Sequence, residues 1–133
     1  MRNFVDAVFN DSRIQKAFRF ITAHEAEIET DQIRLTQIAA PPFGEDDRGR
    51  AFAEELAKAG MRNFTDTIGN VIAGYDGLAS NPVVVGAHLD TVFPASTPLE
   101  LQRRGRTLIL PGISDNGCGI VALLWAAKAA KRC

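Results

Sequence analysis

The sequence predicts an α/β fold in which helices pack on a mixed, largely parallel sheet. Three observations lead to this expectation. Segments with apolar residues at helical spacing alternate with short extended segments rich in β-branched residues. Residues 82–87 form an unbroken apolar run, which is typical of a strand buried on both faces. The 133 residues are 46% apolar and 23% charged, the balance of an ordinary globular domain rather than a disordered chain.

The first forty residues are expected to be mainly helical. One helix is predicted to begin within residues 10–12, where Ser12 and Gln15 can form a capping box. A second helical stretch is expected from about Thr30. It ends at Pro41, because proline has no backbone N–H with which to continue a helix.

A third helix is expected after Gly44, where the acidic residues 45–47 suit the positive end of a helix. Gly60 falls where a residue in the left-handed conformation would end this helix. The pattern then becomes extended. Residues 61–66 and 70–75 are predicted to be two extended segments on either side of a turn.

The second half of the chain is expected to contain the main strand and the last helix. Turn-forming residues at 76–81 precede the apolar strand at 82–87, and residues 99–110 are predicted to form a hairpin. A helix is expected from Gly119 onward, with an apolar stripe formed by Ile120, Leu123, Leu124 and Ala127.

Composition argues against two classes of partner. The formal net charge is −1, so no bulk attraction to nucleic acid or to an anionic membrane is expected. No apolar run is long enough to span a bilayer, and the start of the chain does not resemble a signal peptide. The two cysteines form no disulfide framework, which favours a cytoplasmic location, and Cys118 is expected to be a small buried apolar residue.

The first segment that indicates chemistry follows the predicted buried strand. His88 and Asp90 lie at its carboxyl end, where ligands bind in open α/β sheets. Residues two apart on an extended backbone point to the same side, so Asp90 can reach a ring nitrogen of His88. A carboxylate on one ring nitrogen makes the other a better metal ligand. The alternative is a hydrogen-bonded pair with a purely structural role.

The second segment is the glycine-rich turn at 111–119, which contains Asp115. The predicted hairpin between the two segments can return the chain to the same end of the sheet. Asp115 could then bind two cations, one through each carboxylate oxygen. The alternative is that Asp115 is the N-cap of the last helix, a position that aspartate favours.

Together the two segments resemble a known family. The sequences GAHLDTVFP at 86–94 and PGISDNG at 111–117 resemble the zinc-dependent exopeptidases and amidohydrolases that include aminoacylases, succinyl-diaminopimelate desuccinylase, glutamate carboxypeptidases and peptidase T. Residues 38–45 and 66–73 look like two further segments of this family. The resemblance implies zinc-dependent hydrolysis of an amide or peptide bond in a small peptide or an N-acyl amino acid, with two zinc ions in the complete site.

The resemblance also implies roles for three residues. His88 corresponds to a ligand of one zinc ion, Asp115 to the ligand that bridges both, and Asp90 to the catalytic aspartate that orients the histidine. In the family, two adjacent glutamates, a further acidic residue and a distal histidine complete the site. These later residues have no counterpart assigned in this sequence.

The chain is therefore expected to be the N-terminal part of a catalytic domain, spanning residues 1–133, without the inserted dimerisation domain and the C-terminal half. By itself it is expected to be inactive and to self-associate, with apolar surface exposed on the sheet edge and on the stripe of the last helix. The rival hypothesis is a non-catalytic binding module, or an inactive truncated gene product, with the same fold.

Overall fold

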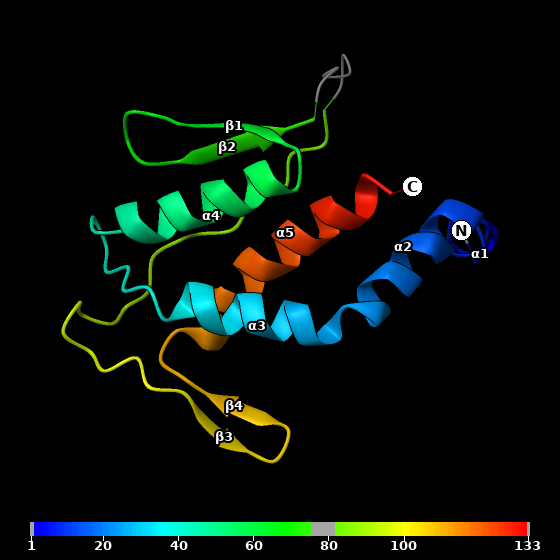
Figure 1. Ribbon diagram of the computed structural model, residues 1–133. Coiled ribbons are helices and arrows are strands. Elements are labelled where there is room, and N and C mark those ends of the chain that lie inside the picture. Colours follow the sequence, from blue (N-terminus) through cyan, green and yellow to red (C-terminus); the bar gives the residue numbers. More distant parts are fainter. Residues whose placement is uncertain (1, 76–81, 133) are drawn as a thin grey trace.

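The computed structural model describes residues 2–75 and 82–132, and the expected turn at 76–81 lies outside the described residues (Figure 1). The helices are α1 (Arg2–Phe9), α2 (Ser12–Ala23), α3 (Glu25–Thr36), α4 (Asp46–Lys58) and α5 (Cys118–Ala130), with an irregular turn, η1 (Ile113–Gly117), before α5. The strands are β1 (Arg62–Thr65), β2 (Val71–Gly74), β3 (Gln102–Arg104) and β4 (Thr107–Ile109). The combination of helices and small sheets confirms the α/β class.

The sheets differ from the expected largely parallel one. Within the described residues there are two sheets, each an antiparallel hairpin of two strands. In the first, Arg62 of β1 pairs with Gly74 of β2, and in the second, Arg104 of β3 pairs with Thr107 of β4. The β3–β4 hairpin was predicted as such, whereas for β1 and β2 the sequence predicted two extended segments on either side of a turn. The prediction of parallel pairing was wrong.

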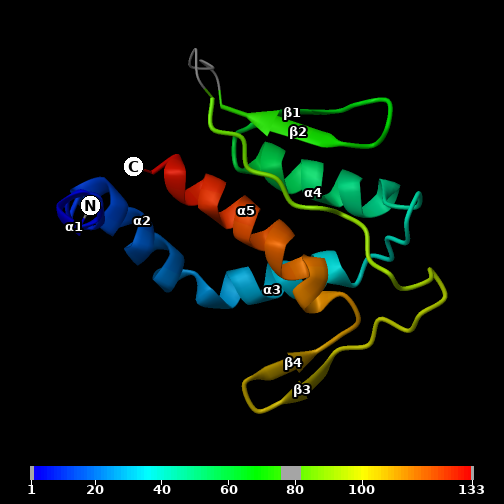
Figure 2. The same cartoon turned by 180° about the vertical axis from the view of Figure 1, so that it is seen from behind.

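The strand expected at 82–87 is the reason for that difference. Residues 82–91 have no regular secondary structure, and Val83 and Val84 are 91% and 87% exposed. An apolar run becomes a buried strand only when neighbouring strands and covering helices are present, and the described residues supply no strand beside it. In Figure 2 the segment runs past α4 toward the β3–β4 hairpin.

The hydrophobic core lies between three helices. It is formed by Leu35, Phe52, Leu56, Met61, Ile120, Val121, Leu124 and Trp125, from α3, α4, α5 and the residue that follows Gly60. The apolar stripe of α5 was expected to be exposed, and this was wrong. Ile120 and Leu124 are buried, and Leu123 and Ala127 pack against the core, because α5 lies among α2, α3 and α4.

The helix ends follow the sequence signals with small shifts. Asp11, rather than Ser12, is the N-cap of α2, and its carboxylate accepts a hydrogen bond from the Arg13 N–H. α3 begins at Glu25, earlier than expected. Gly60 has a φ of 79° after the end of α4, as predicted.

In the described part of the chain, no helix is both long and apolar enough to cross a membrane.

Candidate metal centre

His88 lies between two carboxylates that come from different parts of the chain. Its Nδ1 is 3.1 Å from Oδ1 of Asp90, and its Nε2 is 3.0 Å from Oδ1 of Asp115. The distance to Asp90 falls within the hydrogen-bonding range expected from the His-x-Asp spacing. Asp115, 27 positions after His88, reaches the other side of the same ring. The side chains of all three residues are accessible to solvent.

Asp115 is held by the η1 turn and not by the start of α5. The N-cap of α5 is Gly117, with no side-chain capping bond, so the alternative role of Asp115 as a helix cap is wrong. The turn is closed by a hydrogen bond of 2.9 Å from the Gly117 N–H to the Gly112 carbonyl oxygen. The Gln32 amide of α3 donates to the Ile113 carbonyl at 2.9 Å. The Asp115–Asn116 peptide bond is cis.

Gly112 is a position where the turn requires glycine. Its φ is 81°, and a Cβ there would lie 2.8 Å from Cγ2 of Thr91. The absence of a side chain therefore lets the turn that carries Asp115 pack closely on the segment that carries His88 and Asp90. This close approach brings the two candidate motifs together.

Further hydrogen bonds fix the His88–Asp90 segment, and sequence reasoning missed their donors. The buried Arg48 of α4 donates to the Leu89 carbonyl at 2.8 Å. The Asn116 amide donates to the His88 carbonyl at 3.2 Å, and the Thr91 N–H donates to the Ala40 carbonyl at 2.8 Å. The available signal was the position of Arg48 on the apolar face of the predicted third helix, where a charged residue needs a partner.

The charges around the site shift two pKa values. Partial burial by itself would lower the pKa of His88, but its hydrogen bonds to Asp90 and Asp115 outweigh this and raise the pKa above the ordinary value for histidine. Burial lowers the pKa of the Arg48 guanidinium, and the negative charge of Asp90 opposes that shift.

The donor set fits a zinc ion in part. Zinc binds imidazole nitrogen and carboxylate oxygen at about 2.0–2.2 Å, and two such ligands of a tetrahedral ion lie about 3.3 Å apart. The 3.0 Å between Nε2 of His88 and Oδ1 of Asp115 is close to that separation. A structural or catalytic zinc site needs three or four protein ligands. In the described ranges, no group of three His, Cys, Asp or Glu side chains is arranged to hold a metal ion.

Cys118 and Trp125, both on α5, differ in their exposure to solvent. Cys118 is exposed at the first turn of α5, so the expectation of a buried apolar residue was wrong. Its position precedes the stripe that packs into the core. Trp125 is in the core, and its indole N–H donates to Asp31 at 3.0 Å. The second cysteine, Cys133, lies outside the described residues.

Comparison with known proteins gives one family. Residues 70–132 match the model of Peptidase family M28, a family of zinc-dependent aminopeptidases and carboxypeptidases. The match covers just under half of the 133-residue chain and includes His88, Asp90 and Asp115. No curated protein matches the chain. This part of the chain is thus similar to zinc-dependent peptidases, which agrees with the class of enzyme that the two motifs predict.

Proposed function

We propose that this chain carries part of the zinc site of a hydrolase that cleaves an amide bond in a small peptide or an N-acyl amino acid. In this proposal His88 binds one zinc ion, Asp115 bridges two ions, and Asp90 orients His88. The protein would act as an exopeptidase, such as an aminopeptidase, or as an amidohydrolase of the aminoacylase, desuccinylase, glutamate carboxypeptidase or peptidase T kind. The similarity of residues 70–132 to a peptidase family supports the peptidase class.

The observation that carries the proposal is the arrangement around one imidazole ring. Asp90 lies on Nδ1 and Asp115 lies on Nε2, at 3.1 Å and 3.0 Å. A carboxylate that accepts the Nδ1–H leaves the Nε2 lone pair for a metal ion and increases its basicity. Asp115 adds a carboxylate oxygen at the same point, and its side chain is 83% exposed, so a second ion can approach its other oxygen.

The residues of this chain have separable tasks in such a reaction. Zinc, when bound, supplies a Lewis acid that polarises the amide carbonyl and lowers the pKa of water toward neutrality. His88 must lose the proton on Nε2 to become a ligand, so metal binding releases a proton. Asp90 keeps the remaining proton on Nδ1 and holds the ring in position. Arg48 and Asn116 fix the backbone on either side of that ring through the Leu89 and His88 carbonyls.

The remaining ligands and the general base would come from polypeptide outside the described residues. His88 and Asp115 supply two of the three or four ligands that a zinc ion needs. The rival function is a non-catalytic module of the same fold. Within the described ranges no third acidic, histidine or cysteine side chain joins the pair in a metal-binding arrangement. The two hypotheses therefore differ in whether the pair binds metal at all.

The test is zinc binding, measured by competition with a chromogenic chelator and by the absorption spectrum of bound cobalt. We expect the 133-residue chain to bind zinc weakly. His88→Ala or Asp115→Ala should lower the zinc affinity by about tenfold or more. The matched control is His24→Ala, because His24 is the other of the two histidines. Equal zinc affinity in the His88→Ala and His24→Ala variants would contradict the ligand assignment and favour the non-catalytic module.

Activity is a second and independent readout. A panel of N-acyl amino acids, dipeptides and tripeptides with added zinc should show no turnover by the 133-residue chain. Joining the chain to the segment that follows it in its gene should restore hydrolysis if that segment supplies the missing ligands. Turnover by the 133-residue chain that disappears in His88→Ala would show that no further ligands are needed.

A further inference from the structure

The η1 turn that carries Asp115 rests on the last part of α3, where two side chains contact its two ends. Gln32 and Thr36 lie four positions apart on α3, so they share one side of the helix. The Gln32 amide donates to the carbonyl oxygen of Ile113, the first residue of η1, at 2.9 Å. Thr36 is fully buried and lies against Gly117, the last residue of η1. One helix therefore holds the turn at both ends.

The contact at Gly117 leaves no room for a side chain. A Cβ added there would overlap Oγ1 of Thr36 and lie 3.3 Å from its Cβ. The φ of Gly117 is −52°, which any residue can adopt, so glycine is required for space and not for backbone conformation. The Thr36 hydroxyl donates to the Gln32 carbonyl at 2.7 Å, which fixes the direction of its oxygen. Thr36 thus provides a fixed surface on which the end of the turn packs.

The same end of α3 is linked to the segment that carries His88. Arg48 donates to the Thr36 carbonyl at 3.1 Å and to the Leu89 carbonyl at 2.8 Å. One turn of α3 therefore contacts both segments that supply the candidate ligands, one directly and the other through a single guanidinium. The 3.0 Å between Nε2 of His88 and Oδ1 of Asp115 depends on where these two segments lie on α3.

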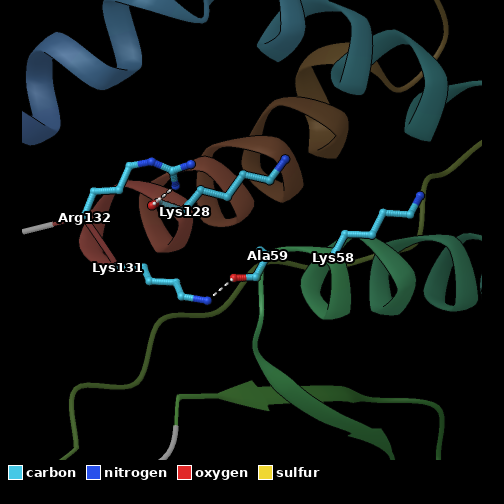
Figure 3. Close-up of a pocket in the computed structure, with 5 residues that line it drawn as sticks. All are labelled: Lys58, Ala59, Lys128, Lys131 and Arg132. Atoms are coloured by element: carbon cyan, nitrogen blue, oxygen red, sulfur yellow. Dashed lines mark hydrogen bonds between the residues drawn. The ribbon is translucent and has the colours of Figure 1, made fainter.

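The helix that follows the turn is held at its far end by separate contacts. Figure 3 shows Lys131 donating to the Ala59 carbonyl, at 3.1 Å, where α5 and α4 end. The other cationic side chains drawn there do not converge, and Arg132 lies over the Phe20 ring. At a rise of about 1.5 Å per residue, this end of α5 lies roughly 20 Å from the turn. These contacts orient α5, and the irregular turn before it needs its own support.

The Asp115 carboxylate has little packing around it. Its side chain is 83% exposed, and its backbone is non-helical, with φ −127° and ψ 92°. We propose that Gln32 and Thr36 are positioning residues that set the distance between this carboxylate and the ring of His88. The inference rests on the proposed function, because it concerns the spacing of two proposed zinc ligands. Loss of either contact should leave the fold in place and move the carboxylate away from Nε2.

The first experiment replaces Gln32 by methionine, which keeps the length and helix propensity of the side chain but cannot donate. Gln37→Met is the matched control, because Gln37 follows α3 and donates to a different carbonyl, that of Leu99, at 3.3 Å. The readout is hydrogen exchange of the Gly117 N–H, whose bond to the Gly112 carbonyl closes the turn. We expect exchange about fivefold faster or more in Gln32→Met, and a change below about twofold in Gln37→Met. Equal exchange in the two variants would overturn the role of Gln32.

Two further readouts follow the carboxylate itself. In the metal-free chain at one fixed pH, the nitrogen NMR shift of His88 Nε2 reports whether Asp115 still contacts the ring. With metal, the zinc affinity and the cobalt spectrum report the same contact. Gln32→Met should move the Nε2 resonance and lower the zinc affinity by about fivefold or more, whereas Gln37→Met should change neither. If Gln32→Met lowers stability but leaves the Nε2 resonance of the folded chain unchanged, Gln32 is structural only and the proposal is wrong.

A pair of size changes tests the Thr36 contact. Gly117→Ala places a methyl group against Oγ1 of Thr36, so it should displace the turn and lower the zinc affinity by about tenfold or more. Thr36→Ala removes the oxygen that this methyl group overlaps. The double variant should therefore recover most of the affinity and the His88 resonance, or recover folding if Gly117→Ala alone does not fold. Additive losses in the double variant would contradict the contact.

The inference and the proposed function fail in different ways. If His88→Ala and the unaltered chain bind zinc equally, the ligand assignment is wrong, while Gly117 exchange and the His88 resonance still decide whether α3 positions the turn. If zinc binding depends on His88 but not on Gln32 or on the size of residue 117, the positioning inference alone is wrong.

Discussion

The guanidinium of Arg48 lies 2.8 Å from the carbonyl oxygen of Leu89, the residue between His88 and Asp90. Arg48 is 1% exposed and also donates to the carbonyl oxygens of Thr36 and Ile38. One buried side chain thus joins the end of α3, the helix α4 and the segment that carries the candidate ligand. A buried arginine satisfied by carbonyl groups can fix irregular backbone that has no strand partner.

The first prediction concerns this link. Replacing Arg48 by methionine keeps the apolar stem but removes the Arg48 donor from one buried carbonyl group, that of Thr36, and from two partly buried ones, those of Ile38 and Leu89. We expect the free energy of unfolding to fall by about 2–4 kcal/mol, because each orphaned buried acceptor costs about 1–3 kcal/mol and removal of the buried charge offsets part of the loss. Urea unfolding measures this change. Zinc affinity should fall as well, since the backbone between His88 and Asp90 loses the hydrogen bond that Arg48 donates to the Leu89 carbonyl.

Arg50→Met is the control for this prediction. Arg50 lies on the same helix but is exposed and pairs only with the exposed Asp47 among the described residues. Its replacement should change stability by less than about 1 kcal/mol. Similar losses in the two variants would mean that the Arg48 hydrogen bonds do not support this segment.

The second prediction tests the contact between α5 and the candidate site. A Cβ added at Gly119 would overlap the side chain of Asn116, which donates to the His88 carbonyl. Gly119→Ala should therefore displace Asn116, reduce zinc affinity and cost about 1–3 kcal/mol of stability through overpacking. Gly86→Ala is the matched control, because nothing lies within 4 Å of the Cβ it would add. Unaltered zinc binding by Gly119→Ala would argue against a role for Asn116.

The third prediction concerns acid stability at the β1–β2 turn. The Asp66 carboxylate accepts hydrogen bonds from the Asn70 side chain and from the N–H groups of Asn70 and Ile68, and these lower its pKa below the ordinary value. A lowered pKa in the folded state means that the carboxylate contributes stability above the unfolded-state pKa of about 3.9. This contribution is lost as the pH falls through the lower, folded-state value.

The measurement is the free energy of unfolding between about pH 6 and pH 2 for the unaltered chain and for Asp66→Asn. The variant should show a weaker pH dependence below about pH 4. Asp11, whose pKa is lowered to about 2 by its bonds to Arg13, should still contribute in both proteins. Parallel pH profiles would show that the Asp66 turn is not formed in solution.

The fourth prediction concerns the exposed run at residues 83–85. Among the described residues no strand pairs with these consecutive valines, so the segment offers both apolar side chains and backbone hydrogen-bonding groups to another chain. We expect the protein to self-associate in a concentration-dependent way, detectable by analytical ultracentrifugation. Val84→Lys should shift the population toward monomer.

Val92→Lys is the control for that experiment, because Val92 is 84% exposed but lies outside the run. It introduces the same charge on an equally accessible valine. If the unaltered chain remains monomeric at all concentrations, the prediction is wrong. An equal effect of the two substitutions would point to general charge repulsion instead of strand pairing.

Local signals determined most of the elements. The acidic residues before α4, Gly60 at its end and the turn residues between the paired strands all act over a few positions, so they can be seen in the sequence. The His-x-Asp spacing is equally local, because two residues on one side of an extended backbone can reach each other without help from the rest of the fold. The sequence by itself therefore determined the α/β class, the β3–β4 hairpin, the extended segments of β1 and β2, and the two candidate motifs.

Only the tertiary structure decided what each segment packs against. The valine run at 83–85 has the pattern of a buried strand, but burial depends on neighbours, and the described residues provide none. The α5 stripe is covered because α2 and α3 contact α5, and Phe52 and Leu56 of α4 belong to the same core cluster. Arg48 holds Leu89 across 41 positions, and Asp115 meets His88 across 27. Such contacts arise from packing over long separations, which short-range periodicity does not encode.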